Sequence, residues 1–302
     1  MMAQWTENSV IDKIKRFLPG GEFLDDDCGV ISSESRQITL VSTDSMQEGT
    51  HFKLDWHPPH LLARKFLKSN LSDIDASGGI PYAFTFNFGL PPTIEEHWID
   101  SFLKSLGDCA RQHSLKVIGG DTFGSLQGLH LTATVWGYAN RHLTRLGVQI
   151  GDYIYIDGPL GLSDQGLNAL RSGERWNPES TSPVIAQHLD PQINLGLGPA
   201  LSKLPHIHAC MDVSDGLSKD LVALAEINKK TIRLTRPFTD SELHGGEDYV
   251  RLFSTPMTLE ELNTHFSFPF EQIAQVEAPQ GPHVVDIYGQ KVLDHTFKHF
   301  QN

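Results

Sequence analysis

Apolar and polar residues follow two periods along the chain, and each period predicts one kind of element. Between positions 80 and 90, large aromatic residues alternate with smaller or polar ones, which is the period of a β-strand. The aromatic positions are Tyr82, Phe84, Phe86 and Phe88, and we expect them to share one face. Other short apolar or alternating runs predict strands over residues 28–31, 38–41, 115–118, 129–137, 153–156, 232–234, 249–253 and 284–288.

Apolar residues at spacings of three and four predict helices between these strands. The expected helices span residues 9–18, 61–71, 94–113, 163–172 and 215–226. The order predicts a mixed α/β (α+β) fold, and 302 residues exceed what one core usually organises. The segment 145–152 looks like a junction, so we expect an N-terminal domain over 1–148 and a C-terminal domain over 149–302.

Several apolar runs lead directly into hydroxyl and carboxylate side chains. We expect the strand 38–41 to end before Ser42-Thr43-Asp44, so that three oxygen ligands leave the edge of the core. Similar combinations, each beside Gly, Ser or Thr, occur at 25–31, 70–73, 117–121 and 211–215. Such oxygens suit Mg²⁺, and bridging ions let an acidic protein hold a polyphosphate. Asp is also common at turns and N-caps, so the spacing alone leaves a metal site and a structural role open.

Charge and composition exclude several classes of protein. The net charge is −13, which argues against a nucleic-acid surface, since phosphate backbones need clustered Lys and Arg. We find no basic amphipathic face, no apolar signal region and no apolar run of the length that a membrane-spanning helix needs. The three cysteines are far apart and fit buried thiols in a reducing compartment, so we expect a cytoplasmic protein.

The chain lacks several common nucleotide-binding and catalytic motifs and contains two weaker ones. The chain has no Walker P-loop, no dinucleotide-binding Gly-x-Gly-x-x-Gly, no protein-kinase catalytic loop and no His-Glu-x-x-His. The segment 159–164 weakly resembles a phosphate loop that enters a helix. The glycines of 245–249 precede paired carboxylates, and this stretch reads equally well as a turn or as part of a site.

Eight short stretches follow one another in a characteristic order. They are Asp26-Asp27-Cys28, Ser42-Thr43-Asp44, 48–52 (Glu-Gly-Thr-His-Phe), Asn70-Leu71-Ser72-Asp73, 118–122 (Ile-Gly-Gly-Asp-Thr), Leu143-Thr144-Arg145, 211–217 (Met-Asp-Val-Ser-Asp-Gly-Leu) and 245–249 (Gly-Gly-Glu-Asp-Tyr). Taken together and in this order, they resemble the thiamine-monophosphate kinases, a family that shares a superfamily with aminoimidazole ribonucleotide synthetase and selenophosphate synthetase. The resemblance implies two α/β domains, the first of which dimerises through its sheet.

The resemblance also implies roles for individual residues. Those that would bind several Mg²⁺ ions are Asp27, Ser42, Thr43, Asp44, Asp73, Asp121, Asp212 and Asp215. Those that would contact ATP are Gly120, Asp121, Arg145 and Ser214. Those that would face thiamine monophosphate are His51, Glu247 and Phe297.

The implied reaction is phosphoryl transfer from ATP to thiamine monophosphate, centred on Asp44, Asp73 and Asp121, giving thiamine diphosphate. The acceptor is an anionic phosphate oxygen, so we expect direct in-line transfer without a nucleophilic side chain. Thiamine monophosphate, ATP and a second copy of the chain are the expected partners, with no nucleic acid or membrane.

The chain departs from the family pattern at several positions, and these departures keep two alternatives open. Asp25 stands in place of Gly, and Asp121 is followed by Thr122-Phe123-Gly124 instead of Thr-Thr-Arg-Gly. Residues 190–194 replace Arg-Pro-x-Pro-Arg, Val250-Arg251 replaces Glu-Leu, and the connection 234–245 is short. The alternatives are a binding protein with little turnover and a related ATP-dependent synthetase of the superfamily. Selenophosphate synthetases place a reactive Cys or selenocysteine in an early flexible segment, whereas Cys28 lies within the carboxylate motif.

Overall fold

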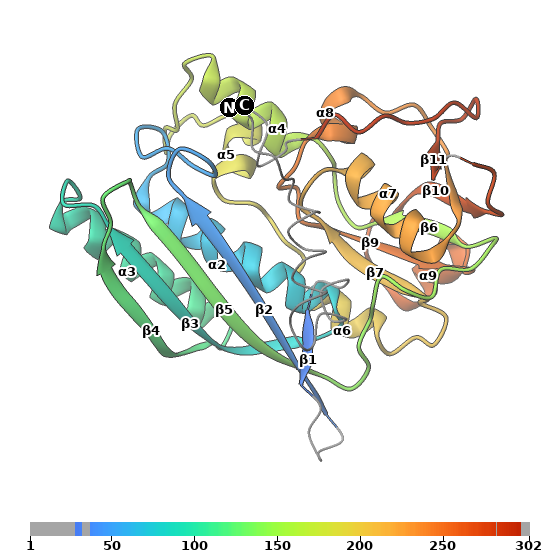
Figure 1. The fold of residues 1–302 in the computed structure, drawn as a ribbon, viewed down its shortest axis with the longest axis horizontal. Coiled ribbons are helices and arrows are strands. Elements are labelled where there is room, and N and C mark those ends of the chain that lie inside the picture. Colours follow the sequence, from blue (N-terminus) through green and yellow to red (C-terminus); the bar gives the residue numbers. More distant parts are fainter. Residues whose placement is uncertain (1–27, 32–36, 282, 297–302) are drawn as a thin grey trace, which may run out of the picture.

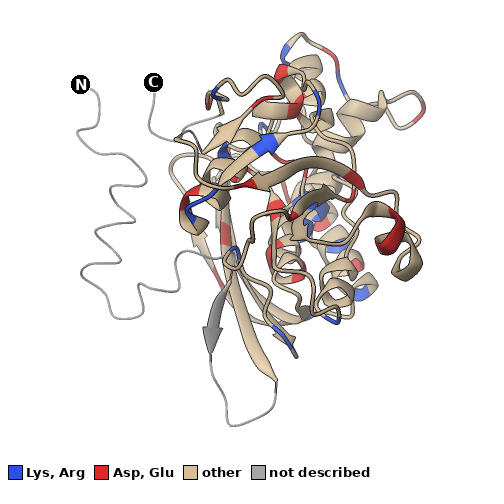
Figure 2. Ribbon diagram, turned by 90° about the vertical axis from the view of Figure 1, so that its right-hand side faces the viewer, with Lys and Arg blue, Asp and Glu red and all other residues tan. Residues whose placement is uncertain are grey.

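The computed structural model describes residues 28–31, 37–281 and 283–296 of the chain. These residues form two β-sheets, with helices around and between them (Figure 1). The acidic excess is not confined to one segment, because Asp and Glu positions lie on many elements with Lys and Arg between them (Figure 2).

The first sheet has the strand order β1-β2-β5-β3-β4. All neighbours are antiparallel except β3 and β4, which run parallel. Two helices, α2 (Pro59–Ala76) and α3 (Glu96–Gln112), pack with the sheet around one apolar core. The strands are β1 (Gly29–Ile31), β2 (Ile38–Gln47), β3 (Ile80–Leu90), β4 (Lys116–Gly124) and β5 (His130–Ala139).

Two expectations about this sheet are wrong in detail. The strand β2 does not end before Ser42, because its backbone pairs with β5 without interruption as far as Gln47. Asp44 therefore lies inside a strand. The aromatic residues of β3 do not all share one face: Phe84 and Phe88 are buried in the core, whereas Tyr82 is exposed and contacts Tyr138. An irregularity in the pairing between Pro81 and Ala83 shifts the alternation, as a β-bulge does.

The second sheet has the order β11-β8-β10-β6-β9-β7 and is antiparallel except for the pair β11 and β8. Its strands are β6 (Tyr153–Ile156), β7 (Ala209–Val213), β8 (Thr231–Leu234), β9 (Val250–Thr255), β10 (Glu271–Glu277) and β11 (Val284–Val285). The accompanying helices are α4 (Leu162–Arg171), α5 (Pro183–Leu189), α6 (Leu197–Leu201), α7 (Leu217–Asn228), α8 (Asp240–His244) and α9 (Leu259–His265).

The helix α2 connects the two halves. It contacts β2 and β5 of the first sheet, and it also contacts β7 and α6 of the second half. Its buried positions include Lys65, Asn70 and Asp75 in addition to many apolar residues, because it is covered on more than one side. A surface helix would bury a single apolar stripe. This central position explains why α2 carries polar groups that face both halves.

The mixed α/β fold class is confirmed by these elements. The patterns did not predict β10 or the short helices α5, α6, α8 and α9, whose seven or fewer residues give little periodicity. The predicted helix over 9–18 lies outside the described residues. The predicted domain boundary at 148/149 falls between β5 and β6. Within the described part of the chain, no helix is both long and apolar enough to cross a membrane.

Candidate active site

A cleft of about 1020 Å³ opens between the two halves of the molecule. The first half contributes Asp44 from β2, Asp73 from α2 and His51 from the turn after β2. The second half contributes the start of α4, the α8 region and the loops before α7 and β9. The helix α5 contributes His188, and the segment after β11 contributes His295. The other lining residues of this half include Ser163, Asp164, Ser214, Asp215, Ser241, His244, Gly245, Gly246, Glu247 and Tyr249.

Two carboxylates from the first half line the cleft, and a serine two residues from one of them binds the other. Side chains alternate along a strand, so Ser42 and Asp44 share the face of β2 that is turned toward α2. The Ser42 hydroxyl donates to Asp73 Oδ2 over 2.5 Å. This bond connects the middle of β2 to α2, and it fixes the orientation of Asp73 in the cleft that Asp44 also lines.

A third carboxylate reaches the same region from the second half. Asp212 lies on β7, is 1% exposed, and accepts a hydrogen bond of 2.5 Å from the Ser72 hydroxyl to its Oδ2. Ser72 and Asp73 are consecutive on α2. One turn of this helix therefore presents a hydroxyl to β7 and a carboxylate to β2.

The pKa of Tyr249 is affected by carboxylates from both halves of the molecule. Its phenol is buried, and burial raises its pKa well above the ordinary value. The negative charges of Glu247, Asp44, Asp212 and Asp73 raise this pKa further, in that order. Four carboxylates from four different segments thus act on one side chain and concentrate negative charge near it.

Glu247 is held by a cation from α2. Lys65 is fully buried, and its Nζ donates to Glu247 Oε2 over 2.9 Å, while Glu247 itself is 26% exposed toward the cleft. His188 Nδ1 lies 3.6 Å from the same oxygen and 3.1 Å from the Ser163 hydroxyl. Burial, and then the charge of Lys65, lower the pKa of His188 well below its ordinary value, so this imidazole is neutral at pH 7. Lys65 therefore balances the charge of Glu247.

The loop 245–249 needs its two glycines and carries unusual backbone angles. A Cβ on Gly245 would lie 2.4 Å from the carbonyl oxygen of Ser241, and one on Gly246 would lie 2.7 Å from that of Ser214. Glu247 and Tyr249 both have positive φ angles, 64° and 52°, which non-glycine residues rarely adopt. Such strain persists where the surroundings hold it in place, and it is frequent in binding sites.

Asp248 points away from the cleft and closes the start of α4. Its Oδ2 accepts from the Gly161 N–H over 2.7 Å, and its Oδ1 accepts from the Ser163 N–H over 3.3 Å. Burial raises the pKa of Asp248 to about 7, with smaller effects from Asp164 and Glu247. The start of α4 is thus occupied by a carboxylate, and the weak similarity of 159–164 to a phosphate loop does not make it a free anion site.

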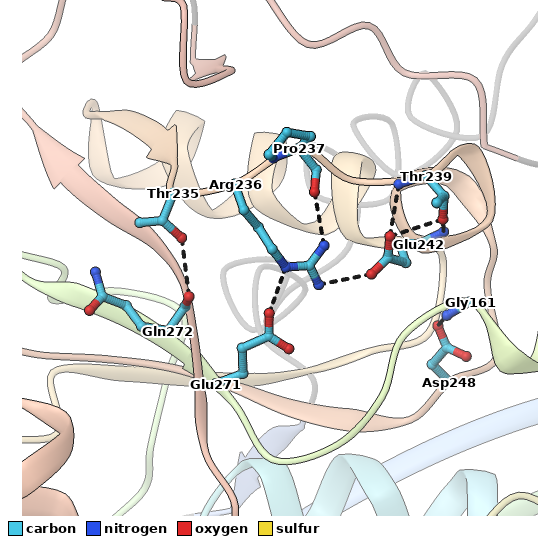
Figure 3. Close-up of polar contacts among 9 residues, drawn as sticks. All are labelled: Gly161, Thr235, Arg236, Pro237, Thr239, Glu242, Asp248, Glu271 and Gln272. Atoms are coloured by element: carbon cyan, nitrogen blue, oxygen red, sulfur yellow. Dashed lines mark hydrogen bonds and ion pairs between the residues drawn. The ribbon is translucent and has the colours of Figure 1, made fainter.

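Arg236 holds the short connection 234–245, which precedes the loop 245–249, in place. Its guanidinium lies between two carboxylates, with Nε donating to Glu271 over 2.6 Å and Nη2 to Glu242 over 2.8 Å (Figure 3). Thr239 and Glu242 form a capping box at the start of α8. Ser241 in this helix donates to Asp164, so α8 and α4 together form one wall of the cleft.

Several known proteins are similar in sequence to this chain. Residues 25–139 match the family described as AIR synthase related protein, N-terminal domain. The chain is 33% identical to the thiamine-monophosphate kinase of Leptospira interrogans over 259 residues, which cover 82% of this chain and 83% of that protein. It is also 33% identical to the enzyme of Escherichia coli K12, over 84% of this chain and 83% of the relative.

The chain belongs to the thiamine-monophosphate kinase family.

A solved structure of this family extends the similarity to three dimensions. AaThiL in complex with AMPPCP and TMP superposes with a TM-score of 0.87 at 26% identity, covering 99% of each chain. The family and the fold expected from the ordered motifs are therefore confirmed.

The residues that the family resemblance implicates are distributed unevenly in the structure. The cleft brings together Asp44, His51, Asp73, Ser214, Asp215 and Glu247, and Asp212 lies just behind it. Asp215 pairs with Lys219 over 2.6 Å. Asp27 and Phe297 lie outside the described residues.

Thr43 points to the other face of the sheet, where its hydroxyl donates to the Ala133 carbonyl over 2.9 Å. Arg145 lies in the loop between the two sheets and is not part of the cleft lining. Neither residue contributes to the cleft as the chain is arranged here.

Gly120 and Asp121 lie far from the cleft within this chain. They belong to β4, and the strands β5 and β3 separate β4 from β2. Three strand spacings amount to about 14 Å. The register aligns Asp44 with Ala133 and Phe86, and Phe86 with Gly120, so Asp121 points to the face opposite Asp44.

The donor atoms of the cleft are carboxylate and hydroxyl oxygens, which fit Mg²⁺. Among the described residues, however, no three His, Cys, Asp or Glu side chains are grouped as a closed metal site. Both observations agree with the usual behaviour of Mg²⁺ beside phosphates, where one or two carboxylates bind the ion and phosphate oxygens and water complete its shell. The arrangement therefore fits ions that arrive with a nucleotide.

Reasoning from sequence missed Lys65 and His188. Lys65 sits on the buried side of α2, four residues after Leu61. A charged residue on an apolar stripe is the signal that could have identified it. His188 lies in the seven-residue helix α5, and its sequence context offers no comparable signal.

Proposed function

We propose that this protein transfers a phosphoryl group from ATP to thiamine monophosphate and forms thiamine diphosphate. The observation that carries the proposal is that Asp44, Asp73, Glu247 and Tyr249 line one cleft, with Asp212 buried directly behind it. Relatives named thiamine-monophosphate kinase, at 33% identity over most of the chain, support the same reaction. The AaThiL complex with AMPPCP and TMP supports ATP and thiamine monophosphate as the two substrates.

In the proposed mechanism Asp44, Asp73 and Asp212 would hold Mg²⁺, with Asp215 at the edge of the cleft. Bound Mg²⁺ would screen the repulsion between the two phosphates and stabilise the charge of the transition state. Ser42 orients Asp73, and Ser72 orients Asp212, so the carboxylates are positioned before the nucleotide arrives. The acceptor oxygen is already anionic, and transfer proceeds in line without a phosphorylated side chain.

Glu247 and His51 would face the thiamine part of the acceptor. A carboxylate next to a phosphate would repel it, so Glu247 suits an amino group or a cationic ring. Lys65 occupies one carboxylate oxygen of Glu247 and leaves the other side open to the cleft. Asp27, Thr43, Gly120, Asp121, Arg145, Ser214 and Phe297 remain assigned to metal, nucleotide or acceptor by family resemblance.

We further propose a cytoplasmic homodimer with a nucleotide-binding domain over 1–148 and a substrate-completing domain over 149–302. Three free, buried cysteines support a reducing compartment. The edge strand β4 and its neighbour β3 support pairing of first sheets, because they expose Ile80, Tyr82, Val117, Ile118 and Phe123. Sedimentation at micromolar concentration should give a dimer, and V117D/I118D should give a monomer. A wild type that sediments as a monomer would remove the dimer from the proposal.

The test of function is incubation with Mg²⁺, ATP and thiamine monophosphate, with thiamine diphosphate measured as product. The variant D44N keeps the shape of Asp44 and removes its charge, so turnover should fall by at least about a thousandfold. The stabilisation by Mg²⁺ and AMPPCP, about 2.7 kcal/mol at a hundredfold excess over Kd, should largely disappear. D108N, on the surface of α3, is the matched control. Normal turnover and a normal thermal shift in D44N would instead assign Asp44 a structural role.

A further inference from the structure

Arg251 is a fully buried cation at the junction of the two halves. It belongs to β9 of the second sheet, and its guanidinium reaches α2 of the first half. Its Nε donates to Asp75 Oδ2 over 2.7 Å, and its Nη1 donates to the Tyr249 carbonyl over 2.8 Å and to the Ser72 hydroxyl over 3.1 Å. One side chain thus joins α2 to the loop that carries Glu247.

Neighbouring carboxylates stabilise the positive charge of this guanidinium, and hydrogen bonds hold these carboxylates in place. Asp75 is 1% exposed and also accepts the N–H groups of Gly196 and Gly198. Asp157 accepts the backbone N–H of Arg251 over 2.6 Å and the amide of Asn194 over 3.0 Å. The charges of Asp75, Asp157 and Asp212 raise the pKa of Arg251 although burial alone would lower it. Arg251 is fully buried and does not line the cleft, so it is not placed to bind a phosphate there directly.

The bond to Ser72 connects this cation to the cleft. A serine hydroxyl carries one hydrogen, and here it points to Asp212 Oδ2 over 2.5 Å. Arg251 Nη1 donates to the oxygen of the same hydroxyl, so the hydrogen of Ser72 cannot turn toward Arg251. The guanidinium thereby orients the Ser72 hydroxyl, and that hydroxyl orients the Asp212 carboxylate.

We propose that Arg251 is a positioning residue for Asp212, acting through Ser72. The proposal rests on the proposed function to the extent that Asp212 holds Mg²⁺ with the nucleotide. Arg251 does not line the cleft; it sets the direction in which a carboxylate directly behind the cleft presents its oxygens. Partners of this kind typically change metal affinity or activity by about tenfold to a hundredfold when removed.

The test uses variants that separate positioning from folding. R251M alone leaves Asp75 and Asp157 buried without their cation and so risks unfolding. R251M/D75N removes both charges at similar shape, and S72A removes only the relaying hydroxyl. The matched control is R233M/E277Q, which removes the bidentate pair of 2.7 and 3.0 Å between β8 and β10. That pair has no bond to the cleft-lining residues.

Two measurements are made on each folded variant. The first is the Mg²⁺ concentration that gives half of the thermal shift at saturating AMPPCP. The second is kcat and KM with thiamine monophosphate at saturating Mg²⁺ and ATP. We expect S72A and R251M/D75N each to need about tenfold more Mg²⁺, with kcat reduced and the KM for thiamine monophosphate unchanged. The triple variant should be no worse than either, because both act on Asp212 by one path, and R233M/E277Q should match the wild type.

Each contrary result has a distinct meaning. A folded R251M/D75N with the Mg²⁺ response and kcat of the wild type would overturn the role of Arg251. Effects of S72A and R251M/D75N that multiply in the triple variant would overturn the relay through Ser72. A wild type that forms no thiamine diphosphate and shows no response to Mg²⁺ and AMPPCP would overturn the proposed function itself, and with it the role of Asp212.

Discussion

Two ion pairs with buried cations join α2 to the segment 247–251, and they differ in the solvent exposure of the carboxylate. In the first, Arg251 of β9 meets Asp75 of α2, with 0% and 1% of the side chains exposed. In the second, Lys65 of α2 meets Glu247, and the carboxylate is 26% exposed toward the cleft. The pairs share their geometry, with N–O distances of 2.7 and 2.9 Å, so the difference lies in the access of water and ligand to the carboxylate.

The difference in exposure indicates different roles: the Arg251–Asp75 pair is a structural connection, and Glu247 is a group that can bind a ligand. Arg251 uses two of its nitrogen atoms to reach three acceptors, which suits the rigid fork of a guanidinium. Lys65 carries a compact charge and donates to one oxygen of Glu247. A closed pair gains nothing from a ligand, whereas an open carboxylate balanced by a buried cation can accept a donor from the cleft. The exposed fraction of the acid distinguishes the two roles.

The largest expected effect comes from removing the cation of the closed pair, and it is an effect on the stability of the fold. R251M should lower the free energy of unfolding by about 3–5 kcal/mol, because it leaves buried carboxylates without their cation. Urea denaturation measures the change. R233M, which breaks a pair with both side chains about one third exposed, should cost less than about 1 kcal/mol. Equal losses in the two variants would show that burial does not distinguish these pairs.

K65M should have a smaller effect, about 2 kcal/mol, because the hydrogen bond to a charged group is lost while Glu247 can still be hydrated. The same denaturation experiment applies. K65M/E247Q should recover part of this loss, since the remaining amide carries no unbalanced charge. A loss as large as that of R251M, without recovery in the double variant, would contradict the open character of the pair.

E247Q should act on binding more than on stability. We expect the KM for thiamine monophosphate to rise about tenfold, equivalent to 1.4 kcal/mol, with the KM for ATP unchanged. Steady-state kinetics with each substrate varied in turn measures both. E226Q on the exposed side of α7 serves as the control. An equal rise in both KM values would argue that Glu247 contacts the nucleotide or its metal ions.

The last expected effect is a pH dependence that comes from Asp248, next to the open pair, and it is the smallest when expressed per unit of pH. Its pKa is raised to about 7 in the folded chain, above the ordinary value near 4. The folded state therefore binds more protons between these values, and Asp248 makes stability fall as pH rises from about 4 to about 7, by less than about 1.4 kcal/mol per unit.

His57 and His188 oppose this trend. Burial lowers both of their pKa values, so the unfolded chain takes up protons below about pH 6.5, and these residues make stability rise with pH up to that point. The contribution of Asp248 is isolated by comparing D248N with the wild type at pH 5 and pH 7. The wild type should lose more stability, or gain less, than D248N over this interval. Parallel pH profiles would mean that Asp248 is ionised throughout.

Much of the fold and part of the site follow from local patterns. Strand and helix periods located most elements of both sheets, because side-chain alternation and helical spacing depend on near neighbours. The ordered motifs identified the family, and six of the implicated side chains do meet in one cleft. The helices α5, α6, α8 and α9 were missed because seven or fewer residues complete too few helical turns to be recognised. The strand β10 was missed because its apolar residues do not alternate regularly, and its pairing with β6 shifts between Gln272 and Ala274.

What the sequence determined by itself was therefore the kind of each long element, the family and the set of acids. Tertiary structure alone decided which groups face one another. Backbone pairing with β5 carries β2 past Asp44 and turns Thr43 to the other face, and the strand order places Asp121 three strands away. The position of α2 between the two halves gives Lys65 and Arg251 their partners, at separations of 182 and 176 residues. Such contacts depend on the path of the whole chain and on the cost of burying an unpaired charge, neither of which a local pattern contains.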